Sequence, residues 1–146
     1  MDTLFSLSFV AVAPIWLLLL VGPRWSLGRR IVTEPWVYSP LAVVYVALVA
    51  VTFPDFVATF SGPDLPSVQE FLTADAAATL GWAHWLVFDA FVGRWMYLDS
   101  ADRGIAHLAV VPCLLLTLFA GPAGFLAYLV VRTLMPTRRE GTQKLH

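Results

Sequence analysis

The first apolar run of the chain is the feature that most limits how the chain can fold. Residues Leu4 to Val21 form 18 consecutive residues in which two serines are the only polar side chains. At about 1.5 Å per residue, a helix of this length spans the hydrocarbon core of a bilayer. A cleavable signal peptide has a basic segment before its apolar core, whereas Asp2 precedes this one. We therefore expect a retained transmembrane helix, kinked at Pro14.

The composition extends this expectation to the whole chain. Of the 146 residues, 59% are hydrophobic and 13% are charged, whereas a soluble domain has about 25% charged residues. The net charge of −1 argues against nucleic acid as a partner, because a phosphate-binding surface is basic. Asn is absent and Lys144 is the only lysine, which is typical of a GC-rich bacterial genome. We expect one all-α integral membrane domain over residues 1–146, in a bacterial inner membrane.

Three further apolar segments complete the predicted bundle of about four transmembrane helices. The first helix covers residues 4–21, and the others are expected at residues 36–53, 76–98 and 105–134, with a basic tail over residues 135–146. The last segment would be about 45 Å long as a straight helix, which exceeds the hydrocarbon core. We expect it to tilt, kink or break, at Pro112 or at the glycines and proline of residues 121–124.

The connecting segments contain further signals. A short interfacial helix is predicted around Phe56, Phe60 and residues 68–72. Residues 99–104 are expected to form a tight turn in which Ser100 or Asp102 caps the next helix.

Loop charges predict the sidedness of the chain. The loop over residues 22–35 contains Arg24, Arg29 and Arg30, which favours the cytoplasm, whereas residues 55–75 contain four acidic residues and no Lys or Arg. The tail is basic and also favours the cytoplasm. Four crossings would place the tail outside, while three crossings and a re-entrant segment would satisfy every loop. The length and the aromatic content of the third segment favour four helices.

Ionisable side chains within the third segment are the first functional candidates. An Asp or Arg at the bilayer centre costs roughly 2.5–3.5 kcal/mol, so such groups face a protein interior or a wet cavity. We predict Asp89 and His84 as acid–base groups and Arg94 as a group that orients a ligand oxygen. The alternative is that they form ion pairs or hydrogen bonds that fix helix packing. At 100° per residue, His84 and Asp89 fall on different helix faces, so a joint site needs neighbouring helices.

Aromatic and turn residues are the second group of candidates. Rings supply flat surfaces for a lipophilic ligand, and polar groups near residues 99–107 can gather at one membrane face. Interface anchoring and a solvated turn are the alternatives. His84, His107 and the carboxylates lack the spacing of a metal site, and no phosphate-binding loop is present, so neither a metal nor a cofactor is expected. The predicted substrate-binding residues are Trp85, Phe88, Trp95, Asp99, Arg103 and His107.

Several segments resemble one known family. The string FDAFVGRW (88–95), the turn residues Asp99 and Arg103, the pair Pro112-Cys113 and the string FAGPAGFLAY (119–128) are similar to the abscisic-acid-deficient-four-like membrane proteins. That family includes a plant plastid protein required for neoxanthin formation. The resemblance implies a small multi-helix membrane protein. For the plant member, it implies isomerisation of the epoxy-carotenoid violaxanthin to the allenic neoxanthin.

Residues and resemblance together favour a membrane protein that acts on or binds a carotenoid-like isoprenoid lipid, as a cofactor-free isomerase. Opening an epoxide to an allene needs an acid, a base and a dry aromatic cavity. Two alternatives stay open. One is a non-catalytic scaffold or pigment-delivery subunit, and the other is a small transporter component that forms a homo-oligomer through Gly121 and Gly124. The expected partners are the bilayer and a lipophilic small molecule.

Overall fold

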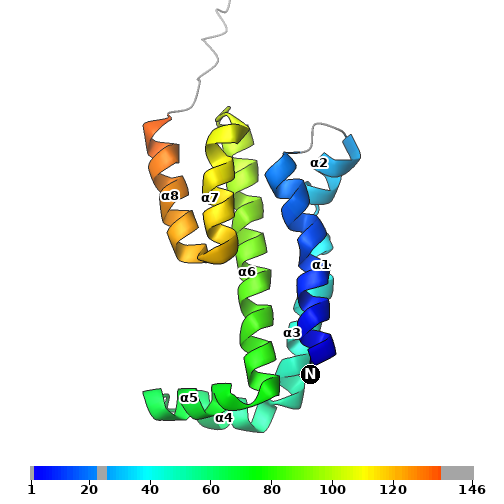
Figure 1. Ribbon diagram of the computed structural model, residues 1–146, viewed down its shortest axis with the longest axis vertical. Helices are drawn as coiled ribbons and strands as arrows, with labels where there is room; N and C mark the ends of the chain where they lie inside the picture. Colours follow the sequence, from blue (N-terminus) through cyan, green and yellow to red (C-terminus); the bar gives the residue numbers. More distant parts are fainter. Residues whose placement is uncertain (1, 23–25, 136–146) are drawn as a thin grey trace, which may run out of the picture.

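The computed structural model describes residues 2–22 and 26–135, and the secondary structure of these residues is entirely helical (Figure 1). The predictions for Arg24 and for the tail beyond residue 135 lie outside the described residues. In chain order the elements are α1 (Asp2–Val21), α2 (Ser26–Thr33), the 3₁₀ helix η1 (Pro35–Tyr38), α3 (Ser39–Val51), α4 (Phe53–Phe60), α5 (Leu65–Thr73), α6 (Asp75–Asp102), α7 (His107–Phe119) and α8 (Gly121–Leu134).

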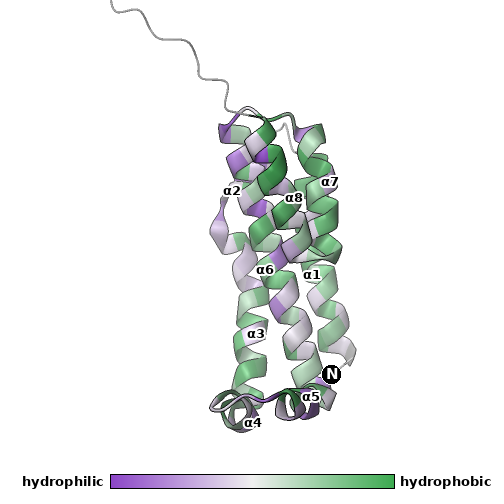
Figure 2. Cartoon of the chain, turned by 90° about the vertical axis from the view of Figure 1, so that its left-hand side faces the viewer, coloured by the Kyte–Doolittle hydropathy of each residue, from purple (hydrophilic) through white to green (hydrophobic). Residues whose placement is uncertain are grey.

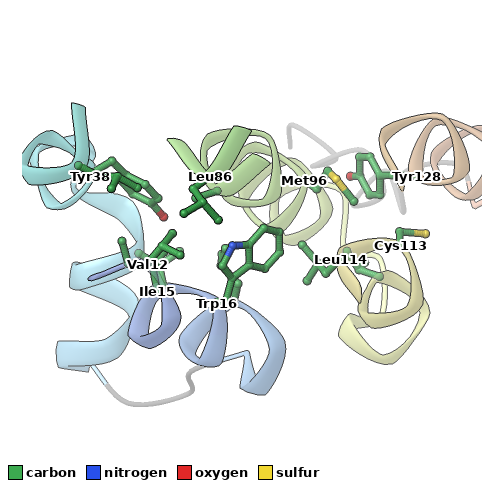
Figure 3. Close-up of a cluster of buried hydrophobic side chains, with 14 of the residues drawn as sticks. Val12, Ile15, Trp16, Tyr38, Leu86, Met96, Cys113, Leu114 and Tyr128 are labelled. Carbon is green, nitrogen blue, oxygen red and sulfur yellow. The ribbon is translucent and has the colours of Figure 1, made fainter. Parts of the chain in front are cut away.

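The long helix α6 is the centre of the molecule, and α1, α3, α7 and α8 all pack against it (Figure 1). Gly93 permits the closest approach to α1, because a Cβ atom there would lie 3.0 Å from Cη2 of Trp16. The core between these helices contains large buried side chains from α1, η1, α6, α7 and α8 (Figure 3). Its members include Val12, Trp16, Leu19, Tyr38, Met96, Leu114 and Tyr128.

The segment predicted as one helix over residues 105–134 is a hairpin of two helices, α7 and α8. The two helices lie side by side in opposite directions, so the start of α7 and the end of α8 are at the same end of the molecule as α2 (Figure 1). Ala120 leaves helical geometry with φ −151° and ψ 71°. Pro122, in the first turn of α8, has no N–H to continue the preceding helix. The break expected at residues 121–124 is therefore confirmed, and a single continuous helix is wrong.

Two predicted connections are also helical. Residues 26–33, expected within a loop, form α2. Helix α6 continues to Asp102, through most of the predicted turn, and ends in a Schellman motif in which Gly104 has φ +67° and Ile105 N–H donates to the Ser100 carbonyl. The predicted capping of the next helix by Ser100 or Asp102 is wrong, because the N-cap of α7 is Ala106, which forms no side-chain cap bond.

At the opposite end, α4 and α5 lie across the start of α6 (Figure 1). They replace the single short helix predicted around Phe56 and Phe60, and these two rings pack with Phe71. Asp64 caps α5. Hydrogen bonding from Ser67, through its side chain and through its N–H at 2.8 Å, lowers the pKa of the Asp64 carboxyl.

The surface is rich in large apolar side chains, such as Leu108 and Phe119, which are both 84% exposed. Figure 2 shows hydrophobic residues along α3 and α7 and hydrophilic residues on α2. Within the described residues, Thr3–Val21 is the one helix that is long and apolar enough to cross a membrane. The pair Ser26–Thr33 and Pro35–Val51, bent by 69°, adds a second if it counts as one span. The all-α class is confirmed, while one or two spans rather than four meet this criterion.

Candidate functional site

A cleft of about 730 Å³ lies where the α7–α8 turn meets the middle of α6. The hairpin ends partway along α6, so the side of α6 beyond the turn is not covered by another helix (Figure 1). We call this the Asp89 cleft. It is lined by Trp82, His84, Trp85, Leu86, Phe88 and Asp89 of α6 and by Leu118, Phe119, Ala120, Gly121 and Pro122 of the turn.

Asp89 is half-buried in the wall of the cleft, against the first residue of α8. A Cβ atom on Gly121 would lie only 2.0 Å from Oδ1 of Asp89, so only a glycine leaves room for the carboxyl group as it is placed. In the described part of the chain, the Asp89 side chain has no hydrogen bond or ion pair with another side chain. A ligand that reaches the carboxyl group therefore has no side-chain partner of Asp89 to displace.

His84 lines the same cleft and is exposed. Its ring stacks on Phe88 at a centroid distance of 4.6 Å and lies 5.6 Å from the ring of Tyr45. The helical spacing correctly places His84 and Asp89 on different faces of α6. They still line one cleft, because the cleft follows α6 for nearly two turns. Its other wall comes from the α7–α8 hairpin, and a site that includes both residues was expected to need such a neighbouring helix.

The predicted ligand-binding rings Trp85 and Phe88 are both walls of the Asp89 cleft, with 64% and 56% of their surfaces exposed. Phe88 also lines a second apolar groove of about 530 Å³ on the side of α6 that faces η1 and α3. An elongated apolar molecule thus finds ring surfaces beside the carboxyl group.

Arg94 lies outside the Asp89 cleft. Its Nε donates a hydrogen bond to the Val32 carbonyl at 2.9 Å, and its Nη2 donates to the Thr33 carbonyl. Those carbonyls are at the end of α2, where the helix has no backbone donors of its own for them and where a positive charge is favourable. The guanidinium is also 6.0 Å from the centre of the Tyr38 ring. In this position Arg94 holds α2 against α6.

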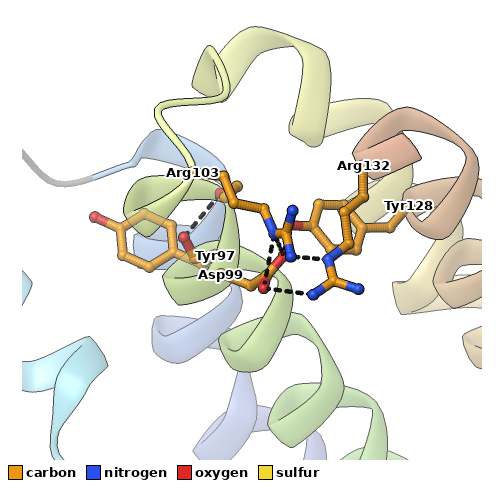
Figure 4. A network of polar contacts seen from close by, with 6 residues as sticks. Tyr97, Asp99, Arg103, Tyr128 and Arg132 are labelled. Carbon is orange, nitrogen blue, oxygen red and sulfur yellow. Dashed lines mark hydrogen bonds and ion pairs between the residues drawn. The ribbon is translucent and has the colours of Figure 1, made fainter. Parts of the chain in front are cut away.

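Asp99 and Arg103 form a separate polar group near the end of α6, together with two residues of α8 (Figure 4). The Asp99 carboxylate accepts hydrogen bonds from Tyr128 Oη at 2.6 Å, Arg132 Nε at 2.9 Å and Arg103 Nε at 3.1 Å. We call these four residues the Asp99 network. Two of the three donors, Tyr128 and Arg132, are on α8 and fasten it to α6, since charge-assisted bonds are about twice as strong as neutral ones.

Trp95 and His107 also serve packing between helices. The Trp95 ring lies 5.5 Å from that of Tyr128 and 5.7 Å from the Arg132 guanidinium. His107 Nε2 donates to the carbonyl of Leu20 at 3.0 Å, which links the start of α7 to the end of α1. The structure therefore brings His84, Trp85, Phe88 and Asp89 together and places the other candidates elsewhere.

Sequence reasoning missed two parts of this arrangement. Gly121 was interpreted as a helix break, and its contact with Asp89 depends on the register between α8 and α6, which no local pattern encodes. Tyr128 and Arg132 were not recognised as partners of Asp99, although their spacing of one helical turn is a signal that they share a face. In the described chain no group of three His, Cys, Asp or Glu side chains is placed to hold a metal ion.

Comparison with known proteins identifies the family. Residues 3–128 match the sequence profile described as ABA DEFICIENT 4-like. The chain belongs to the ABA DEFICIENT 4-like family. It is also similar to the protein ABA DEFICIENT 4, chloroplastic, of Arabidopsis thaliana, with 24% identity over 141 residues that cover 92% of this chain and 62% of the plant protein. The chain thus spans less than two thirds of that relative's length. No solved structure matches it.

The resemblance expected from the sequence is therefore confirmed. Two of the strings that resemble the ABA DEFICIENT 4-like family, residues 88–95 and 119–128, meet in space. Phe88 and Asp89 come from the first, and Phe119, Gly121 and Pro122 come from the second, and all five line the Asp89 cleft. Two of the segments that resemble the family thus contribute to the candidate site, while Asp99, Arg103 and the pair Pro112-Cys113 lie outside it.

Proposed function

We propose that this ABA DEFICIENT 4-like protein is an integral membrane protein that binds a carotenoid-like isoprenoid lipid in the Asp89 cleft and isomerises it without a cofactor. The observation behind this proposal is the position of Asp89. A carboxyl group without a side-chain partner in the described chain faces an aromatic cleft that is walled by exposed rings. Such a site suits a ligand with an apolar body and a polar end.

A membrane environment explains the surface. Exposed Leu, Val and Phe side chains run along α1, α7 and α8, and water would disfavour so many of them. We place α1, the α2–η1–α3 segment and α6 across the bilayer, with the α7–α8 hairpin entering and leaving from one side. This arrangement has three crossings and puts Arg132, at the end of α8, on the same side as the arginines of α2, in agreement with the positive-inside rule. We assign it to a bacterial inner membrane.

The walls of the cleft fit a polyene with a ring at its end. Trp85, Phe88 and Phe119 are large and exposed, so a flat apolar molecule can lie against them. Asp89 lines the same cleft and can meet an oxygen on the ring. The resemblance links a plant member of the family to neoxanthin formation. This relationship supports an oxygenated carotenoid as the ligand class.

The reaction that these groups support is the opening of an epoxide to an allenic alcohol. Protonated Asp89 gives its proton to the epoxide oxygen as one carbon–oxygen bond breaks, which produces a hydroxyl group. His84 takes the proton from the neighbouring vinylic carbon, and the released electron pair forms the new carbon–carbon double bond. Return of that proton to Asp89 completes the cycle, so substrate and product have one formula and no cofactor is consumed.

Lipid extraction from the purified protein tests ligand binding. The protein is produced in a carotenoid-making bacterial host, purified in mild detergent, and its bound lipid is identified by absorbance and mass spectrometry. We expect a stoichiometric polyene in the wild type. Ala120→Trp should fill the cleft and reduce the bound polyene at least fivefold, whereas the matched control Leu126→Trp, on the exposed face of α8, should retain it.

Two results would contradict ligand binding in the cleft, and a third would contradict the isomerase activity alone. Phospholipid as the only bound lipid would exclude a pigment cleft and favour a transporter component. Equal polyene content in the Ala120→Trp and Leu126→Trp proteins would show that the polyene binds elsewhere on the apolar surface. Stoichiometric polyene without any turnover would instead identify a pigment-delivery subunit.

A further inference from the structure

The carboxyl group of Asp89 is in contact with the backbone at the start of α8. Measured from an ideal Cβ position on Gly121, the carboxyl atoms of Asp89 lie at 2.0 Å (Oδ1), 2.9 Å (Cγ) and 3.3 Å (Oδ2). All three nearest atoms belong to Asp89, so the missing side chain of Gly121 is the space that the carboxyl group occupies. Gly121 is itself buried.

The electrostatic character of this contact follows from the direction of α8. The helix has 14 residues and begins at Gly121, and its N-cap, Ala120, offers no side chain to bond the first N–H groups. Pro122 has no N–H group, and the N–H groups of Ala123 and Gly124 already donate to the Ala120 carbonyl at 2.9 and 3.1 Å, so α8 acts on Asp89 through the positive end of its dipole. A carboxylate at this position is stabilised, by typically 0.3–1 kcal/mol for exposed groups and more in partly buried sites.

The register that brings Gly121 to Asp89 is fixed at two other points. The Asp99 network fastens the opposite end of α8 to α6 through Tyr128 and Arg132. Gly124 permits the close approach of α7, because a Cβ atom there would lie 2.2 Å from the backbone nitrogen of Thr117. Helix α8 is thus held so that its start reaches the middle of α6.

Few other charged groups face Asp89. His84 lies on the same helix, and the residues that α7 and α8 contribute to the cleft include no titratable side chain within the described chain. The start of α8 is therefore the main polar feature that α7 and α8 contribute beside Asp89.

We infer that Gly121 is a positioning residue for Asp89, and that the start of α8 holds the Asp89 carboxyl group toward the cleft and stabilises the carboxylate that remains after proton donation. This inference rests on the proposed function for its chemical meaning. The contact itself can be tested without a substrate.

The variant Gly121→Ala tests the contact directly. The added methyl group meets the end of a flexible side chain, so the carboxyl group of Asp89 can turn away while the fold is kept. The matched control is Gly81→Ala, on the same helix as Asp89. There the nearest atom to the added Cβ is Leu72 Cδ2 at 3.8 Å. The probe is a hydrophobic carbodiimide, which reacts with protonated carboxyl groups, and its attachment to Asp89 is measured by peptide mass spectrometry.

We expect Asp89 in Gly121→Ala to be labelled at least threefold faster than in the wild type, because it loses the positive end of α8, and Gly81→Ala to match the wild type. Equal labelling in Gly121→Ala and the wild type would overturn the inference. If Gly121→Ala does not fold, the double variant Gly121→Ala/Asp89→Ala should fold, since the clash is removed, and failure of both would also overturn it.

A second readout separates this inference from the proposed function. With violaxanthin as the probe, Gly121→Ala should lower kcat at least tenfold and change the Kd less than threefold, since the aromatic walls are unaltered. A changed labelling rate in a protein whose wild type does not convert violaxanthin would leave Gly121 as the positioning residue and reject the isomerase. Conversion by the wild type with unchanged labelling in Gly121→Ala would reject the positioning role alone.

Discussion

The Tyr128 hydroxyl donates a 2.6 Å hydrogen bond to the Asp99 carboxylate, and this bond joins α8 to α6 ten residues beyond Asp89. Because α8 runs in the same direction as α6 (Figure 1), its start then lies beside Asp89. One aspartate of α6 thus anchors the hairpin, while the other faces the cleft that the hairpin leaves open. The two aspartates have different environments and, on our account, different roles.

Asp99→Asn should weaken the attachment of α8. The substitution removes the charge that Arg103 and Arg132 share and leaves both guanidinium groups with a neutral partner. We expect a loss of roughly 1–3 kcal/mol in unfolding free energy, the usual range for hydrogen bonds to charged groups. Thermal unfolding in detergent measures it. Asp102→Asn, at an exposed position, is the control and should unfold like the wild type; equal stability of the two variants would contradict the anchoring role.

Arg94→Ala should lower stability but leave ligand binding intact. The variant loses both hydrogen bonds to the carbonyls that end α2, at a cost of roughly 1–3 kcal/mol. Since Arg94 does not line the Asp89 cleft, the amount of polyene bound per folded protein should stay within twofold of the wild type. Loss of the bound polyene at unchanged stability would instead assign Arg94 to the ligand site, as the sequence analysis first suggested.

Gly124→Ala should destabilise the α7–α8 hairpin. The added methyl group would meet the Thr117 backbone nitrogen at 2.2 Å, and a backbone atom cannot turn away as a carboxyl group can. We expect a cost of about 1–3 kcal/mol or more from overpacking. Gly62→Ala, with no atom within 4 Å of its Cβ position, is the comparison for thermal unfolding. A Gly124→Ala protein as stable as Gly62→Ala would show that the two helices pack less closely.

Cysteine labelling should locate both ends of the hairpin on one side of the membrane. In a Cys113→Ala background, single cysteines replace Arg29, Ser61 and Thr133, which are exposed. A membrane-impermeant maleimide applied from one side should label the Arg29 and Thr133 positions together and the Ser61 position only from the other side. Labelling of the Thr133 position together with the Ser61 position would indicate a fourth crossing and exclude the hairpin.

Several features of the fold were predictable because they depend on local signals. The apolar run after Asp2 gives α1, and Gly121-Pro122 marks the helix break. The hairpin itself was not, because the length of residues 105–134 suits a span as well as two shorter helices. The hairpin depends instead on packing contacts, both within it, such as Thr117 against Gly124, and between α6 and α8, such as Asp99 against Arg132.

The site was predictable to a similar degree. Asp89 and His84 are ionisable side chains in an apolar helix, and Trp85 and Phe88 are rings close to them in the sequence, so residue type and position marked all four as candidates. Arg94 was marked by the same reasoning, yet its partners are the carbonyls of Val32 and Thr33. Such backbone acceptors have no sequence signature, so the sequence cannot separate a buried cation that caps a helix from one that meets a ligand.

Conversion of violaxanthin by purified protein tests the central claim most directly, with the wild type compared to Asp89→Asn and His84→Ala. Product is quantified by chromatography and mass spectrometry, and bound carotenoid is measured in the same samples. We expect that the wild type forms the allenic isomer and that Asp89→Asn binds the same amount of carotenoid but converts it about 10²–10⁴-fold more slowly. Full turnover by both variants, or bound violaxanthin that the wild type leaves unchanged, would contradict this claim.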